Sequence, residues 1–151
     1  MKYILLLLLT ASLCQGQIAR PPKDSKGLVV STTLEDNVSL ETIARFMNEH
    51  HFPIDKVDKK NKIITSLFKE FGLIYVQAII TVDKGLVIVT GLWSSTEKLT
   101  ELSGEKFVKV PIQYKGQSVS YDKRAYAAIE GLAYGINHTI QSEKIFYLPA
   151  D

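Results

Sequence analysis

The stretch LIYVQAIITVDKGLVIVTGLW (residues 73–93) decides the fold, because two long apolar segments flank one short turn. Residues 73–82 and 86–93 are rich in the β-branched and aromatic side chains that favour strands. Between them, Asp83, Lys84 and Gly85 are typical of a tight turn, in which Gly85 is suited to a positive φ. The sequence therefore predicts a long β-hairpin.

Before the hairpin, three shorter strands and one helix are predicted. The strands are residues 27–34 (GLVVSTTL), 54–58 (IDKVD) and, after the turn KKN, 62–71 (KIITSLFKEF). An amphipathic helix is expected over residues 39–50, with Ser39 as its N-cap. Its apolar positions at helical spacing are Leu40, Ile43, Ala44 and Met47.

After the hairpin, residues 94–116 are mostly polar and predict a long loop with one edge strand around Pro111. Residues 120–140 (SYDKRAYAAIEGLAYGINHTI) predict a second helix, and the tail KIFYLPAD either adds a short strand or packs on the domain. The helix has an apolar stripe of Ala125, Ile129, Leu132, Ala133 and Ile136, and a small-residue stripe of Ala127, Gly131 and Gly135. Each glycine costs about 1 kcal/mol relative to alanine in a helix, so we expect close packing against the sheet or the first helix to compensate.

These elements predict an α+β fold, a two-layer sandwich in which two helices pack on one face of a mostly antiparallel sheet. The expected order is β-α-β-β-β-β-α. A sheet covered on one side only should alternate cleanly between apolar and polar residues, but the hairpin is apolar on both faces. Something is therefore expected to cover the second face: the loop 94–116, the C-terminal tail, a second copy or a ligand. Tyr75, Ile79 and Trp93 are the candidate binding residues.

The N-terminus has the pattern of a secretory signal peptide, with a basic start, an apolar run of about ten residues and a small residue before the expected cut. We expect cleavage between Gly16 and Gln17, a flexible leader over residues 17–26 and a single domain over residues 27–151. The apolar run is too short for a transmembrane helix. A lipid anchor at Cys14 is the disfavoured alternative, because Leu13 stands where lipoprotein signals have a small residue. The sequence thus predicts an exported protein, periplasmic or extracellular.

A family resemblance follows from the order of these segments. FPIDKVDKKNKIIT leads into long strands, and VDKGLVIVTGLW, a polar loop and a helix rich in alanine and aromatic residues follow. Over about residues 27–138, the chain resembles small exported domains of unknown function, common in Bacteroidetes-type bacteria, that have a TBP-like (TATA-binding-protein-like) fold. It is also similar in outline to the repeated domains of Gram-negative outer-membrane assembly lipoproteins. The resemblance brings no catalytic residues with it, and the fold name implies nothing about DNA.

Neither a metal nor a cofactor is predicted. His50 and His51 are adjacent and would point about 100° apart on a helix, whereas zinc-binding pairs use i, i+4 spacing. His51 follows Met47 on the apolar stripe and is expected to cap the helix. The lysines between residues 56 and 62 stand close to acidic residues, and no aromatic residue lies among them. In the whole sequence, 18 Lys and Arg residues against 16 Asp and Glu residues give a net charge of only +2. These features argue for a solvated hairpin tip and against a nucleic-acid partner.

We expect no enzymatic activity, because nucleophile motifs are missing and only three histidines are present. The alternative is a small secreted hydrolase or carbohydrate-binding protein that uses the loop 94–116, where Glu101 and Glu105 lie. Asn37 and Asn137 fit the glycosylation pattern, which has no meaning in a bacterial protein. The favoured prediction is an exported, non-catalytic module of the cell envelope that binds a protein, a ligand or a second copy of itself.

Overall fold

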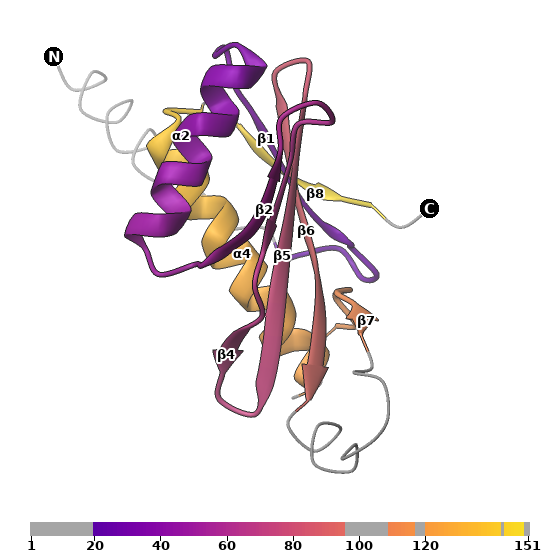
Figure 1. Ribbon diagram of the computed structural model, residues 1–151. Helices are drawn as coiled ribbons and strands as arrows, with labels where there is room; N and C mark the ends of the chain where they lie inside the picture. The colour runs from indigo at the N-terminus through magenta and orange to yellow at the C-terminus, as the bar shows by residue number, and fades with distance from the viewer. Residues whose placement is uncertain (1–19, 96–108, 117–119, 143, 150–151) are drawn as a thin grey trace, which may run out of the picture.

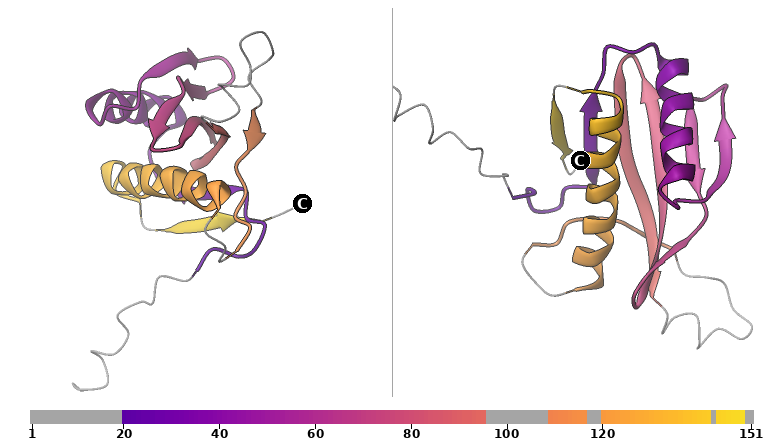
Figure 2. Two further views of the ribbon diagram at one scale, coloured as in Figure 1. Left: turned by 90° about the horizontal axis from the view of Figure 1, so that it is seen from below. Right: turned by 90° about the vertical axis from the view of Figure 1, so that its left-hand side faces the viewer.

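The computed structural model describes residues 20–95, 109–116, 120–142 and 144–149, which form two helices on one face of an antiparallel sheet (Figures 1 and 2). This arrangement confirms the predicted two-layer α+β class. Along the sheet the strands follow the order β2-β3-β5-β6-β1-β8, with β4 paired to β5 and β7 paired to β6. In chain order the elements are β1 (Gly27–Ser31), α2 (Asp36–Glu49), β2 (Ile54–Asp58), β3 (Ile63–Ser66), β4 (Lys69–Phe71), β5 (Ile74–Asp83), β6 (Leu86–Ser95), β7 (Val110–Pro111), α4 (Tyr121–Thr139) and β8 (Ile145–Leu148).

The hairpin β5–β6 forms the centre of the sheet. Its strands pair along their whole length, from Asp83 opposite Leu86 to Ile74 opposite Ser95. Lys84 (φ 48°) and Gly85 (φ 75°) both have the left-handed conformation, which a two-residue hairpin turn needs to match the twist of the strands. The predicted hairpin and its turn are confirmed.

The core lies between the helices and one face of this hairpin. The even-numbered residues of β5, from Ile74 to Val82, are fully buried under the helices. All five residues of the predicted apolar stripe on the second helix are buried against them, as is Tyr126. The two helices run in opposite directions, because α2 starts beside the β5–β6 turn and α4 starts beside Trp93 at the other end of β6.

The first helix begins three residues earlier than predicted. Glu35 is the N-cap of α2, and Ser39 lies inside the helix, where its backbone N–H donates to the Glu35 carbonyl at 2.9 Å. The Ser39 side chain is buried and makes no hydrogen bond with the described residues. The prediction of Ser39 as N-cap was wrong because the start of the helix is held from outside by the distant turn that Asp36 contacts.

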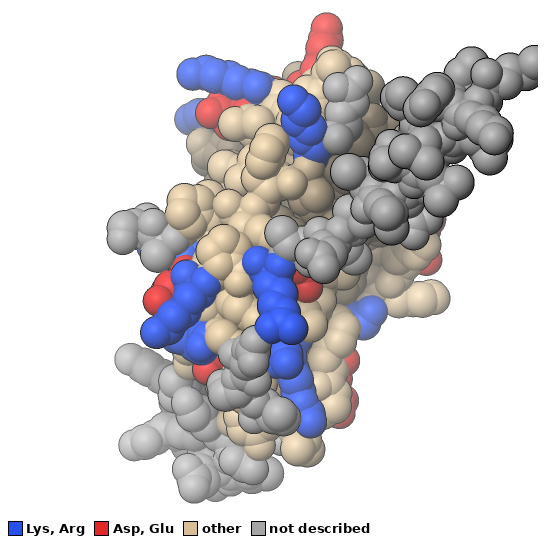
Figure 3. Space-filling model, turned by 180° about the vertical axis from the view of Figure 1, so that it is seen from behind, with Lys and Arg blue, Asp and Glu red and all other residues tan. Residues whose placement is uncertain are grey.

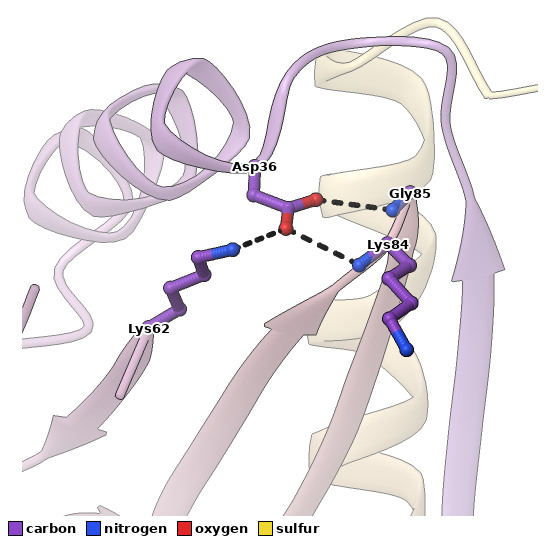
Figure 4. A network of polar contacts seen from close by, with 4 residues as sticks. All are labelled: Asp36, Lys62, Lys84 and Gly85. Carbon is purple, nitrogen blue, oxygen red and sulfur yellow. Dashed lines mark hydrogen bonds and ion pairs between the residues drawn. The ribbon is translucent and has the colours of Figure 1, made fainter. Parts of the chain in front are cut away.

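Asp36 joins three elements at this end of the molecule (Figure 4). Its Oδ1 accepts from the backbone N–H of Gly85 at 3.0 Å, and its Oδ2 accepts from the backbone N–H of Lys84 at 3.2 Å and from Lys62 Nζ at 2.5 Å. The hydrogen bonds from Lys62 and Gly85 lower the pKa of the Asp36 carboxyl below its ordinary value of 3.8. The ionised carboxylate thereby ties α2 to the hairpin turn and to the start of β3.

Replacing Asp36 by asparagine is expected to lower the melting temperature at pH 7. Because the pKa of Asp36 is lower in the folded than in the unfolded state, its stabilisation is present above about pH 4 and is lost as the pH falls through the folded-state pKa. The variant should therefore lose less stability than the wild type between pH 7 and pH 2. Thermal melts across this range check the prediction, with Asp55→Asn on the exposed side of β2 as the control. Equal losses in the two variants would contradict the role of Asp36.

The predicted strand over residues 62–71 forms two strands, β3 and β4. The break occurs at Ser66, whose side chain accepts a hydrogen bond from the backbone of β5. Ser66 Oγ accepts from the backbone N–H of Ala78 at 2.8 Å, and Gln77 Nε2 donates to the Ser66 carbonyl at 2.8 Å. After this point the chain leaves β3 and pairs again with β5 as β4, beside α4. The break brings Lys69 and Phe71 to the helix layer.

The last two strands in chain order, β7 and β8, pair with β6 and β1. The tail adds the short strand β8 beside β1, and β7 forms the predicted edge strand with Pro111 opposite Leu92. Before β1, Ser25 is fully buried and the backbone N–H of Asp24 donates to the Tyr114 carbonyl at 2.6 Å. Ordered packing therefore begins before the expected domain boundary at residue 27.

Candidate functional site

The structure brings two of the three candidate binding residues together and separates the third. Tyr75 lies opposite Ser94 and Ile79 lies opposite Thr90, so both side chains are on the face without helices. Trp93 lies opposite Val76 on the helix-covered face, where it is buried and its ring centroid is 6.0 Å from that of Tyr121. Its assignment to the same face as Tyr75 was wrong. Trp93 shares a face with its partner Val76, and Val76 and Tyr75 point to opposite faces because they are neighbours in one strand.

The side of the sheet that carries Tyr75 and Ile79 is covered by neither α2 nor α4 (Figure 2). The register places further apolar side chains beside them, because Val29 lies opposite both Ile88 and Phe146. All of these side chains are half-exposed or exposed, and Phe146 is 52% exposed. We call this surface the open face and define it by Val29, Tyr75, Ile79, Ile88, Leu92 and Phe146.

Two polar side chains of the open face, those of Gln77 and Thr90, form hydrogen bonds within the sheet. Gln77 is almost buried, and its amide donates to the Ser66 carbonyl. Thr90 Oγ1 donates to the Ile79 carbonyl at 3.2 Å. Internal hydrogen bonds therefore occupy these groups, and the surface is mainly apolar. An apolar sheet face of this kind suits a protein partner better than a small molecule, which binds in concave sites.

The lysines of the β2–β3 turn form ordinary surface contacts. Lys59 Nζ lies 3.5 Å from Glu41 Oε1 with both side chains largely exposed, and Lys62 contacts Asp36. On the side seen in Figure 3, Lys and Arg side chains occur together with Asp and Glu side chains. The hairpin tip is thus solvated, as the sequence indicates.

The two adjacent histidines end the first helix. His50 is the C-cap residue of α2, and its ring centroid lies 4.4 Å from that of Phe46. His51 follows in a left-handed conformation (φ 58°), its backbone N–H donates to the Asn48 carbonyl at 3.4 Å, and that of Phe52 donates to the Met47 carbonyl at 2.8 Å, so the backbone at His51 caps the helix as expected. The His51 side chain is exposed and does not continue the apolar stripe. Within the described residues, no three His, Cys, Asp or Glu side chains are grouped as metal ligands would be.

A second surface feature, not predicted from the sequence, is a groove between α2, α4 and β4 with a volume of about 510 Å³. Its walls include Phe46 from α2, His50 at the C-cap of this helix, and Phe71 from β4. Gly131 and His138 contribute from α4. The small-residue stripe of the second helix was the available signal, but the sequence does not tell what lies opposite it.

The small-residue stripe shapes this groove in two ways. A Cβ at Gly135 would lie 2.4 Å from Phe46 Cζ, so this glycine allows the first helix to approach closely. A Cβ at Gly131 would meet no atom within 4 Å, so this glycine leaves the groove open. The expected close packing is therefore found at Gly135 and is absent at Gly131.

Several predictions fall on residues that the structure does not describe. These are the cleavage site Gly16–Gln17, the lipid-anchor candidate Cys14, and Glu101 and Glu105 of the long loop. None of the described helices combines the length and apolar character needed to cross a membrane. Asn37 is exposed in the first turn of α2, and Asn137 is half-buried near the end of α4.

Neither a protein-family model nor a curated protein matches the sequence. The resemblance to exported domains with a TBP-like fold therefore stays a prediction.

Proposed function

We propose that the protein is an exported, non-catalytic binding module of the cell envelope, and that its open face binds another protein. The observation that supports this proposal is the row of half-exposed apolar side chains across β8, β1, β6 and β5. Contiguous exposed apolar surface of this kind usually marks an interaction site. The export signal in the sequence is the basis for placing the module in the envelope.

The occupant that we propose is a second copy of the chain. Two sheets packed face to face through their apolar sides are a stable arrangement, as in β-sandwiches. A twofold axis through the open face would bring the same side chains together from both copies and would match the two surfaces to each other. Phe146 and Val29 of one copy would then be covered by the open face of the other.

Charged substitutions on the open face should weaken the association strongly. Wild-type protein is expected to show a concentration-dependent shift from monomer to dimer in gel filtration, and Tyr75→Lys and Phe146→Glu should weaken dimer formation by about tenfold or more. Lysine is chosen at position 75 because Glu70 lies opposite Tyr75, so the new charge is not repelled. Val38→Glu on α2 replaces an exposed apolar residue on the helix side and should leave the association unchanged.

If the wild type is a monomer at every concentration, the same variants still test whether the open face binds another protein. In that case the second copy is the wrong occupant, and capture of an envelope protein that is lost with Tyr75→Lys but kept with Val38→Glu would support a different protein partner. A monomer whose captured proteins are the same for all variants would refute binding at the open face.

A further inference from the structure

The groove between α2, α4 and β4 has the features of a ligand site, and it lies in the helix layer, away from the open face. Its volume of about 510 Å³ is within the range of roughly 300–1,000 Å³ that is usual for small-molecule pockets. The groove exists because α4 has no side chain at Gly131, where a Cβ would meet open space. The cost of a glycine inside a helix is thus not offset by closer packing there.

The walls of the groove are aromatic. Phe46 comes from α2, Phe52 from the segment after it, and Phe71 from β4. The ring centroids of Phe52 and Phe71 lie 5.8 Å apart at an interplanar angle of 39°. Together these rings offer an apolar surface to a molecule that enters between the helices.

One ammonium group is held over this aromatic surface. Lys69 Nζ lies 4.7 Å from the ring centroid of Phe52 and 5.4 Å from that of Phe71. Contact with the ring faces holds the charge in place while leaving its hydrogen-bond donors available. None of the described lining residues is an aspartate or glutamate, and the other ionisable groups, His50 and His138, are both able to donate hydrogen bonds.

From this combination we infer that the groove binds an amphipathic carboxylate, with the apolar chain or ring along Phe46, Phe52 and Gly131 and the carboxylate at Lys69. A carboxylate forms a charge-assisted hydrogen bond with an ammonium group, and the apolar part replaces water on the aromatic walls. The charge of the groove complements an anion and disfavours a cation. This site does not depend on the open face or on its partner.

Calorimetric titration of the full chain with decanoate, and with decanol as the uncharged analogue, tests the inference. The wild type should bind one decanoate, and decanol about tenfold more weakly, since only the carboxylate contacts Lys69. Lys69→Met keeps the apolar stem and removes the charge, so it should weaken decanoate about tenfold and leave decanol unchanged. Tyr75→Lys on the open face is the control and should bind decanoate as the wild type does.

Gly131→Leu provides the second arm, because leucine fills the open space and favours the helix. This variant should melt no lower than the wild type and should lose decanoate binding. The inference would be overturned by a wild type that binds no decanoate, by a folded Gly131→Leu variant that still binds it, or by equal affinities for decanoate and decanol. Dimer formation of the same variants reports on the open face separately.

Discussion

Replacing Gly91 by alanine is expected to lower the free energy of unfolding by about 2–4 kcal/mol. Gly91 lies in the middle of β6 opposite Ala78, on the face covered by α4. A Cβ there would be 2.5 Å from the backbone carbonyl oxygen of Gln77, 3.0 Å from Ile112 Cδ1 and 3.3 Å from Ile129 Cγ2. The nearest atom belongs to the backbone of the central hairpin, so it cannot move without breaking the pairing of the strands.

The same substitution at Gly131 is the matched control and should have the opposite sign. Because a Cβ at Gly131 meets open space, alanine gains helix propensity at no steric cost and should stabilise the protein by up to about 1 kcal/mol. Urea denaturation followed by circular dichroism measures both variants. If Gly91→Ala were neutral, the Gln77 carbonyl would not lie as close to Gly91 as described.

Truncation of Tyr126 to alanine is expected to cost about 3–5 kcal/mol, and Tyr126→Phe about 1–2 kcal/mol. The ring is fully buried between α4 and β1, and its hydroxyl lies 2.9 Å from Ser25 Oγ and donates to the Gly27 carbonyl at 3.2 Å. Ser25 Oγ in turn donates to the Leu148 carbonyl at 2.9 Å. Phenylalanine keeps the packing but leaves these polar groups with one partner fewer, whereas alanine also leaves a cavity.

The pH dependence of stability separates the hydroxyl from the ring. Burial raises the pKa of Tyr126 to about 12. Since the unfolded chain loses this proton near pH 10, stability that is complete below pH 10 should be lost as the pH rises toward 12. Tyr126→Phe should reduce this loss, and Tyr75→Phe on the half-exposed open face serves as the control. Because burial also raises the pKa of Tyr147, part of the loss should remain in both variants. Identical alkaline profiles for Tyr126→Phe and the wild type would contradict the buried network.

The central hairpin was predictable because its information is local. The β-branched and aromatic residues, the Asp83-Lys84-Gly85 turn and the lengths of the two segments lie within one stretch of the chain. The two-residue turn also fixes Val76 opposite Trp93, so the face of Trp93 could have been deduced from the register. The apolar residues on both faces concealed this, because they gave no sign of which face is inside.

The start of α2 and the groove were not predictable, because each depends on residues far apart in the chain. Asp36 is held by Gly85 and Lys62, and nothing around Asp36 in the sequence indicates these partners. His50 and His138 have unremarkable places near the ends of two helices until the fold brings both to one groove. The break after Ser66 likewise depends on its hydrogen bond with Ala78 in the neighbouring strand.

Site-specific photo-crosslinking at position 75 tests the central claim most directly. A benzophenone amino acid resembles the tyrosine that it replaces and would lie on the open face, and the same group at Glu41 on α2 is the control. We predict that irradiation in cells joins position 75, but not position 41, to a protein, and that the joined protein is a second copy of the chain. Equal products at both positions, or no product at position 75, would contradict binding through the open face.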